Sequence, residues 1–304
     1  MTTLRILAAS LALGFAAQAH AFDFGKLIEE GLKQQQEQKA PEQQAAPPAD
    51  GAAAQPAPRQ KFDAAKLGFA LFGDYTPEQE ARIGQQLAGD LLGAAPLVKD
   101  DKLQRYVNLV GNWVALQSGR NDVAWRFGVI ESDDINAFAA PGGYVFVTRG
   151  LYRMLDNEAE LAGVLGHEIA HVTRKHHLKV LKKSTLIGEL GKAVGNKARN
   201  SDEAVQNLIG NGAEMLARGL DKSAEFEADR IGMVYAARAG YTPWGLPGVL
   251  QNMAALPAKD SRTSFLYKTH PHPADRLAKL GEAVGDRLDA VEGRDNASRF
   301  YRIQ

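Results

Sequence analysis

The segment VLGHEIAHVTRKHH, residues 164–177, restricts the fold of this chain more than any other part of it. It contains a HExxH pattern, in which His167 and His171 are four residues apart and Glu168 follows the first histidine. Residues at this spacing lie on one face of a helix, so both imidazoles can bind one metal ion at about 2 Å. Glu168 can then take a proton from a water molecule on that ion. Apolar residues surround the pattern, which predicts a buried helix rather than a surface pair of histidines, and a buried His-Glu-His set is costly unless it binds something.

A third ligand is needed, and His177 is one candidate because it lies ten residues after His167, where one large class of zinc proteases keeps its third histidine. That arrangement requires the helix to break after His171, with a glycine where this chain has Arg174. Arginine is a good helix former, and in a continuous helix His177 would lie about 9 Å along the axis from His171. We therefore expect the helix to continue, with His176 and His177 near its C-terminal end, where positive charge suits the helix dipole.

The segment SAEFEADRIG, residues 223–232, offers a carboxylate as the alternative third ligand. Glu225 and Asp229 are four residues apart and share a helical face, whereas Glu227 points elsewhere. Catalytic zinc often takes two histidines and one glutamate, and a second carboxylate orients a ligand histidine in such sites. These residues alone are equally consistent with an acidic helix face exposed to solvent.

Four segments in a fixed order are similar to a known family. They are NAFAAPGGYVFVTRGL (136–151), GHEIAHVTRKH (166–176), EFEADRIG (225–232) and THPHPADR (269–276). Together they resemble the metallopeptidase family of the HtpX heat-shock protease and the CAAX prenyl endopeptidases, in particular its exported soluble branch, over residues 76–280. The resemblance implies that His167, His171 and Glu225 bind Zn²⁺, one ion per chain, and that Glu168 is the catalytic base.

The resemblance also implies that the stretch before the HExxH helix borders the cleft. An exposed strand edge there can hydrogen-bond a substrate backbone as an added strand. The alternative is an ordinary core strand. The residues of the expected substrate-binding strand are Asn136, Ala137, Phe138 and Ala139.

The segment THPHPADR carries the last candidate site residues. His270 matches the family position from which a histidine can approach the zinc as an inhibitory fourth ligand, and His272 is an equally placed rival in the sequence. Arg276 is a candidate to stabilise the oxyanion of the reaction. The structural alternative is that the two prolines fix a turn and Arg276 forms an ion pair.

The N-terminal part of the chain has a different composition from the rest. Residues 1–21 have a basic start, a twelve-residue apolar run and Ala19-His20-Ala21 before the expected cleavage point, which is typical of a signal peptide and too short for a membrane anchor. Residues 22–61 are rich in Gln, Ala and Pro and predict a disordered linker. The catalytic domain is expected over residues 62–304.

Periodicity and turn residues predict an α+β fold that is mainly α, with a long HExxH helix, a small β-sheet and surrounding helices. A cap at Asn157 with Glu160 three residues on begins the HExxH helix. Further helices are expected over residues 77–92, 101–117, 223–239 and 272–284, and strands over 123–132 and 142–150.

Composition narrows the function further. The chain has 36 basic and 36 acidic residues, so its net charge does not favour binding to nucleic acid. It has no cysteine, so a metal site must use His, Asp and Glu. No segment after the signal peptide is long enough to span a membrane, and the chain ends at Gln304 without the helical repeat domain that we would expect in the exported branch.

We therefore expect a periplasmic zinc endopeptidase that acts on unfolded envelope or outer-membrane polypeptides, with the outer-membrane assembly machinery as a candidate partner. Two alternatives are a metal-containing chaperone or assembly factor with little proteolysis, and a structural metal module.

Overall fold

The computed structural model describes residues 63–193 and 220–303, apart from 258 and 265. The expected signal peptide and linker, residues 1–21 and 22–61, lie outside the described residues. The described part is mainly helical with one small sheet, which confirms the predicted fold class. Its helices are α2 (Ala64–Phe72), α3 (Pro77–Ala94), α4 (Asp101–Ala115), α5 (Arg149–Met154), α6 (Glu158–Thr173), α7 (His176–Ala193), α10 (Lys222–Arg238), α11 (Gly245–Ala254), α12 (Leu266–Thr269) and α13 (Pro273–Val284).

The sheet has three strands in the order β1 (Arg126–Ile130), β3 (Tyr144–Thr148) and β2 (Ala137–Ala140). β1 pairs with β3 in parallel and β2 pairs with β3 antiparallel, so β2 is an edge strand of this sheet. Gly142 and Gly143 make the turn between β2 and β3 at φ values of 73° and 92°, a backbone region that favours glycine. The two strands expected from the sequence are confirmed with shorter bounds.

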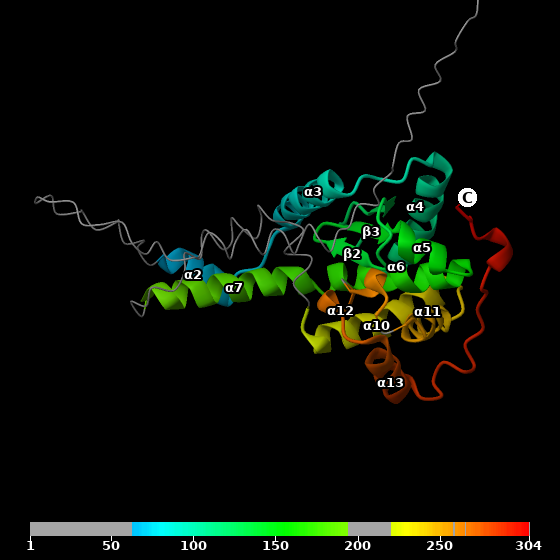
Figure 1. The fold of residues 1–304 in the computed structure, drawn as a ribbon. Coiled ribbons are helices and arrows are strands. Elements are labelled where there is room, and N and C mark those ends of the chain that lie inside the picture. The colour runs from blue at the N-terminus through cyan, green and yellow to red at the C-terminus, as the bar shows by residue number, and fades with distance from the viewer. Residues whose placement is uncertain (1–62, 194–219, 258, 265, 304) are drawn as a thin grey trace, which may run out of the picture.

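Both faces of the sheet are buried, because alternate residues of each strand enter different parts of the core. Val145 and Val147 of β3 face the core formed with α4 and α6. Phe146 of the same strand faces a second cluster formed with α3 and the start of α7. Figure 1 shows the sheet between α3 and α6, and α4 packs with α6 on the face that carries Val145 and Val147.

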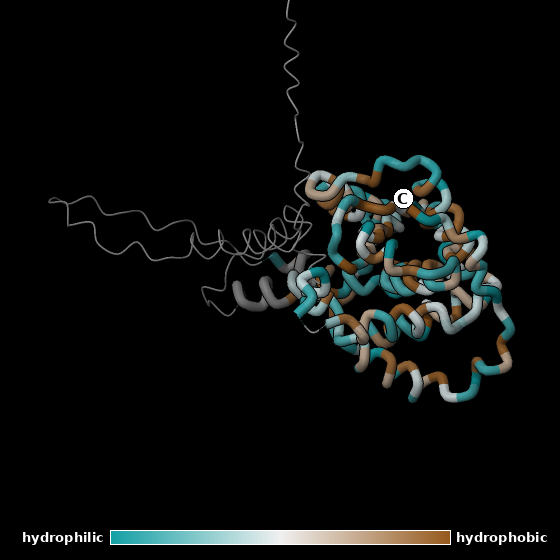
Figure 2. The backbone as a smooth tube through the Cα atoms, turned by 45° about the vertical axis from the view of Figure 1, so that its right-hand side comes forward, coloured by the Kyte–Doolittle hydropathy of each residue, from teal (hydrophilic) through white to brown (hydrophobic). Residues whose placement is uncertain are grey.

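Helix α6 is the centre of the fold. Every residue from Glu158 to Val172 is buried, as the apolar surroundings of the HExxH pattern predicted. α6 packs against α4, α10, α11 and the sheet, and α13 covers α10 and α11. The outer helices are amphipathic: Figure 2 shows hydrophobic and hydrophilic residues alternating along α13, where Leu277, Leu280 and Val284 pack on the core.

The close crossing of α6 and α10 depends on two glycines. A Cβ at Gly166 would lie 2.6 Å from the carbonyl oxygen of Gly232, and a Cβ at Gly232 would lie 2.5 Å from the backbone nitrogen of His167. Real side chains do not fit at such distances, so both positions require glycine. The two backbones therefore meet beside the HExxH pattern.

The helix starts and stops read from the sequence are largely confirmed. Thr76 and Gln79 form a capping box at α3, and Asn157 accepts a hydrogen bond from the Glu160 backbone at α6. α10 ends just before Gly240, which has a φ of 89°. α11 was not expected from the sequence.

The expectation that the HExxH helix continues past Arg174 is wrong. α6 ends at Thr173, Lys175 takes a φ of 55°, and α7 begins at His176. Left-handed backbone is unfavourable for a residue with a Cβ, and here Lys175 forms ion pairs with Glu80 at 2.7 Å and Asp74 at 3.3 Å. His176 and His177 therefore begin a new helix instead of ending α6.

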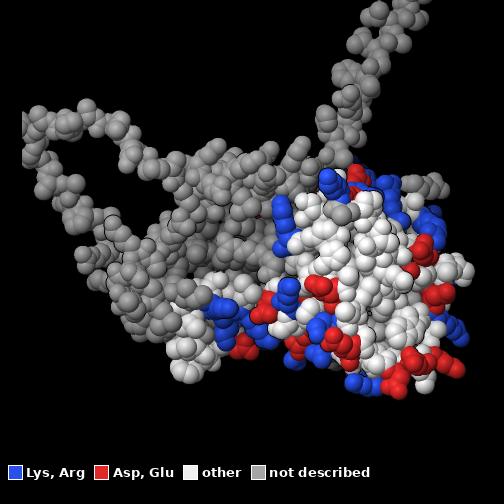
Figure 3. Space-filling model, turned by 60° about the horizontal axis from the view of Figure 1, so that its bottom comes forward, with Lys and Arg blue, Asp and Glu red and all other residues white. Residues whose placement is uncertain are grey.

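The surface of the described residues carries both signs of charge. On the face seen in Figure 3, acidic and basic side chains are interspersed around an uncharged area. Among the described helices, none is both long and apolar enough to cross a membrane.

Candidate metal centre

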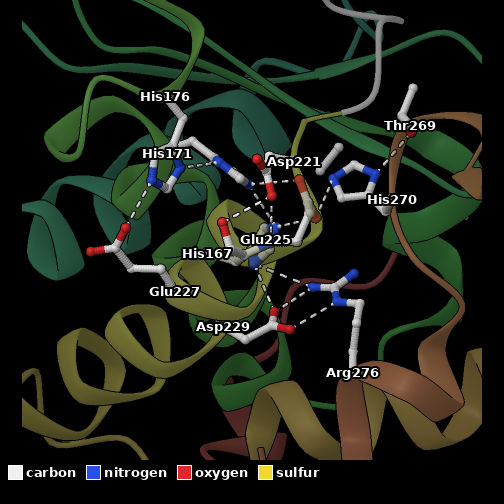
Figure 4. Close-up of polar contacts among 12 residues, drawn as sticks. His167, His171, His176, Asp221, Glu225, Glu227, Asp229, Thr269, His270 and Arg276 are labelled. Atoms are coloured by element: carbon white, nitrogen blue, oxygen red, sulfur yellow. Dashed lines mark hydrogen bonds and ion pairs between the residues drawn. The ribbon is translucent and has the colours of Figure 1, made fainter. Parts of the chain in front are cut away.

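Four side chains from two helices and one adjoining turn converge at the centre of the fold. His167 and His171 come from α6, Glu225 from α10, and His270 from the residue that follows α12. One ligand atom from each lies within 4.8 Å of all the others. Figure 4 shows the four side chains pointing toward one another. The sequence interval of 54 residues between His171 and Glu225 is thus closed by the α6–α10 crossing.

The spacing of the ligand atoms fits a tetrahedral metal ion. Glu225 Oε2 lies 3.7 Å from His167 Nε2 and from His270 Nε2, and Glu225 Oε1 lies 3.5 Å from His171 Nε2. Ligand atoms at about 2.0–2.1 Å from a tetrahedral ion lie about 3.3 Å from each other. Two histidines and a glutamate without cysteine are also a donor set that Zn²⁺ accepts.

Glu225 supplies an independent argument for a cation. Both of its carboxylate oxygens are buried, and neither has a hydrogen-bond partner among the described residues. Burial raises the pKa of this carboxyl well above its usual range, against the opposing effect of Arg276. A buried carboxylate without partners is costly, and a metal ion between Glu225 and the histidines removes that cost.

The outer ring nitrogen of His167 contacts the carboxylate of Asp229. The His167 Nδ1 atom lies 2.8 Å from Asp229 Oδ1, so the opposite ring nitrogen, Nε2, faces the cluster. Although burial alone would raise it, the pKa of Asp229 lies well below its usual range because Arg276 and His167 stabilise the charged form. A carboxylate bound to the outer nitrogen of a metal-binding histidine fixes its tautomer and ring orientation.

Arg276 is the ion-pair partner of Asp229 in this arrangement. Its Nε donates a hydrogen bond to Asp229 Oδ2 at 3.0 Å, and its Nη2 lies 3.2 Å from His167 Nδ1. The side chain is buried. Arg276 therefore forms an ion pair, which was the alternative to a role in catalysis. It also lines a cavity beside His167 and Glu168.

Glu168 is buried at the boundary of two small cavities. One has a volume of about 30 Å³ and is lined also by Val164, Leu246 and Arg276. The other has a volume of about 20 Å³ and is lined also by His171 and the three residues 137–139. Each has room for a water molecule. Burial raises the pKa of Glu168 to about 8, although Arg276 opposes the shift.

The two histidines of THPHPADR have separate positions. His270 Nδ1 lies 2.8 Å from the Thr269 hydroxyl, and its Nε2 faces Glu225. His272 caps α13 by accepting from the Ala274 backbone and stacks on Tyr267. His270 is therefore the histidine of this pair that belongs to the cluster.

Strand β2 borders the site at one edge of the sheet. The Thr148 backbone nitrogen donates to the Asn136 carbonyl at 3.0 Å, so this pair is hydrogen-bonded across β2 and β3. Hydrogen-bonded and non-hydrogen-bonded pairs alternate in an antiparallel ladder. The backbone groups of Ala137 and Ala139 therefore point away from β3, and both residues line the cavity that also contains Glu168.

Sequence reasoning missed the part that His176 plays around this site. His176 Nδ1 lies 2.9 Å from His171 Nδ1, and His176 Nε2 lies 3.2 Å from Glu227 Oε2. His177 contacts the His171 ring and lines the same small cavity as Glu168, but it is not one of the four clustered residues. The helix breaks as a third histidine ligand would need, but the group of clustered residues has Glu225 and His270 beside His167 and His171.

The fold and site define a class of protein. A buried HExxH helix, crossed by a second helix that supplies a glutamate, is the arrangement of a metallopeptidase catalytic domain. The model of Peptidase family M48 matches residues 101–284, and the chain belongs to that family.

Several curated proteins are similar to this chain. The beta-barrel assembly-enhancing protease of Yersinia pestis is 33% identical over 70% of this chain and 45% of its own length, and that of Escherichia coli K12 is 32% identical over 66% and 42%. The mitochondrial metalloendopeptidase OMA1 of Schizosaccharomyces pombe is 27% identical over 69% of this chain and 63% of its own length. The chain thus spans less than half the length of the two bacterial relatives.

Proposed function

We propose that this chain is a zinc-dependent endopeptidase that hydrolyses peptide bonds of misfolded or unassembled envelope and outer-membrane proteins. The observation that carries the proposal is the cluster of the buried His167, His171 and Glu225 with the partly buried His270, and Glu168 lies beside it. The buried Glu225 carboxylate without a hydrogen-bond partner among the described residues supports a cation at this point.

The chemistry of the proposal divides between the ion and the side chains. A bound Zn²⁺ would polarise the scissile carbonyl and lower the pKa of a water molecule to about 7. Glu168 accepts the proton of that water and passes it to the leaving amine. Asp229 holds His167 in the metal-binding orientation. Arg276 stabilises the oxyanion through the guanidinium nitrogen that does not donate to Asp229, and burial strengthens that interaction.

The proposed substrate position is along the edge of β2. An extended polypeptide that pairs with the backbone of Ala137 and Ala139 would pass the cavity that contains Glu168. Phe138 and Asn136 belong to the same edge segment and position it against β3. Backbone pairing selects for extended chain rather than for particular side chains, which suits a protease for unfolded proteins.

His270 is proposed to regulate the site as a fourth ligand. Its Nε2 atom is as far from Glu225 as the Nε2 atom of His167 is, at 3.7 Å. A catalytic zinc site needs an open position for water, so His270 in this position lowers resting activity. The same observation favours the second candidate function, a metal-containing chaperone or assembly factor with little routine proteolysis.

The proposed location is the periplasm, after export through the signal peptide of residues 1–21. The name of the bacterial relatives, beta-barrel assembly-enhancing protease, supports outer-membrane assembly as the setting and its machinery as a candidate partner. Amino-terminal sequencing of the exported chain tests this part, and a mature chain that does not begin at Phe22 contradicts it.

One comparison tests the activity. Wild type, Glu168→Gln and His270→Ala are loaded with zinc, their metal content is measured, and each is mixed with an unfolded outer-membrane protein. We expect Glu168→Gln to bind zinc and to lose cleavage by at least about 100-fold, because the general base is gone. His270→Ala should cleave faster than wild type.

The outcomes separate the candidate functions. Equal cleavage by wild type and Glu168→Gln excludes the endopeptidase. Prevention of aggregation by both, with no cleavage even in His270→Ala, favours the assembly factor. A wild-type chain that retains tightly bound zinc but admits no exchangeable water, as probed by azide binding to the cobalt form, favours a structural metal module.

A further inference from the structure

His176 and Glu227 form a hydrogen-bonded chain that ends on the metal cluster, and neither belongs to the candidate ligand set. The chain runs from Glu227 Oε2 to His176 Nε2 at 3.2 Å, and from His176 Nδ1 to His171 Nδ1 at 2.9 Å. Arg174 holds the outer end, with Nη2 at 2.6 Å from Glu227 Oε1. Figure 4 shows His176 and Glu227 on the far side of His171 from Glu225.

The direction of each hydrogen bond follows from the position of the ligand atom. His171 presents Nε2 to the cluster, 3.5 Å from Glu225 Oε1. A histidine that binds a metal ion through Nε2 is neutral and carries its proton on Nδ1. His171 Nδ1–H therefore donates to His176 Nδ1, which leaves the proton of His176 on Nε2, where it donates to the Glu227 carboxylate.

The backbone break between α6 and α7 makes this geometry accessible. In a continuous helix, residues five apart such as His171 and His176 lie on different faces. With Lys175 at a φ of 55°, the chain turns and brings His176 back against His171. His176 is 3% exposed, so its ring nitrogens are satisfied by protein groups rather than by solvent.

We propose that His176 is a positioning residue for the metal centre, which fixes the tautomer and ring orientation of His171, and that Glu227 fixes His176 in turn. The two ligand histidines of α6 are then held by carboxylates of α10 in different ways. Asp229 binds His167 directly, and Glu227 acts on His171 through one intervening imidazole. This inference rests on the metal site of the proposed function and goes beyond its ligands and catalytic base.

Zinc affinity of the full chain is the first test. Competition with a chromophoric chelator gives the dissociation constant of zinc from each protein. Each variant is first prepared without metal and compared with wild type by far-UV circular dichroism, to show that it is folded. We expect His176→Leu to weaken zinc binding by about 10–100-fold, the range found when the outer partner of a ligand is removed. His176→Asn should recover most of this loss, because an amide oxygen can replace the Nδ1 acceptor.

Two matched variants make the result specific. His177→Leu removes the neighbouring histidine, which contacts the His171 ring without a hydrogen bond between the two, and should bind zinc more tightly than His176→Leu. His171→Ala removes a candidate ligand and should abolish tight binding. Loss in His171→Ala with no loss in His176→Leu overturns the present inference alone, whereas no loss in either variant overturns the metal site itself.

A second measurement needs no substitution, so it remains decisive where His176→Leu fails to fold. Nitrogen NMR of histidine-labelled, zinc-loaded wild type reports which ring nitrogen carries each proton. We expect His171 to be protonated at Nδ1 and His176 at Nε2 only, with the Nδ1 of His176 unprotonated. A proton on His176 Nδ1 contradicts the proposed chain of hydrogen bonds, since two N–H groups cannot face each other at 2.9 Å.

Discussion

Glu168 makes the stability of the metal-free protein depend on pH in a way that one substitution can isolate. Burial raises the pKa of its carboxyl from an ordinary value of 4.5 to about 8. The folded chain therefore binds one more proton at this group than the unfolded chain does between these values. Its contribution to stability is fully present below about pH 4.5 and is lost as the pH rises through 8. Replacing Glu168 by Gln removes the titration and leaves the rest of the site.

The window above pH 7 separates this effect from the histidines. Burial lowers the pKa of His167 and His171 from 6.5, so they change the free energy of unfolding below neutral pH. From pH 7.0 to 8.5, a folded pKa of about 8 predicts that wild type loses about 1.3 kcal/mol relative to Glu168→Gln. For a domain of this size the difference corresponds to about 3–5 °C in Tm.

Thermal unfolding in the presence of EDTA measures the effect, at several pH values in that window and at constant ionic strength. The quantity compared is the slope of Tm against pH, so a constant difference between the two proteins does not matter. Parallel slopes for wild type and Glu168→Gln would refute the reasoning, because Glu168 would then have the same pKa in the folded and the unfolded chain. Saturating zinc should flatten the wild-type slope, since a nearby cation favours the carboxylate form.

Three further changes test the packing and the site. Glu158→Gln should lower the free energy of unfolding by about 1–3 kcal/mol in urea titrations, because the buried carboxylate accepts from Tyr106 and Tyr241 at 2.9 Å each. Gly89→Ala should raise it by about 0.5–1 kcal/mol, since the position is helical and nothing lies within 4 Å of the added carbon. Zinc at 100 times its dissociation constant should stabilise the wild-type chain by about 2.7 kcal/mol, and Glu225→Gln should respond less in the same calorimetric scan.

The part of the site that the sequence predicts is the part set by local geometry. His167, Glu168 and His171 follow from helical spacing, and the Glu225–Asp229 pair has the same spacing on α10. Which of these meet in space depends on the crossing of α6 and α10, and the resemblance to a known family supplied that information. Which of His270 and His272 reaches the cluster depends on where α13 begins. The proline at the first position of α13 indicates this start only in part.

The break between α6 and α7 could not be predicted from helix propensity. Arg174 and Lys175 are both good helix formers, but residue preferences amount to about 0.7 kcal/mol or less. In the folded chain, the ion pair of Lys175 with the buried Glu80 and the hydrogen bond of His176 to His171 both require the turn. Tertiary contacts thus outweigh the local helix preference. His176, whose position depends on this turn, was therefore not expected at the site from the sequence.

Helix α10 supplies a candidate ligand and both outer carboxylates of the site, so the position of α10 on α6 should control metal affinity as well as stability. Gly166→Ala tests this, because its Cβ would meet the Gly232 carbonyl at 2.6 Å and push the two helices apart. Gly163→Ala is the matched control, since its Cβ would meet the Leu246 nitrogen of α11 at the same 2.6 Å.

Both substitutions overpack the core and should cost about 1–3 kcal/mol in urea unfolding of the metal-free chain. Only Gly166→Ala moves the carboxylates of α10 relative to the two histidines. When the two variants lose the same stability, Gly166→Ala should therefore weaken zinc binding more than Gly163→Ala. Equal losses of affinity would mean that the centre responds to general loosening of α6 and not to its crossing with α10.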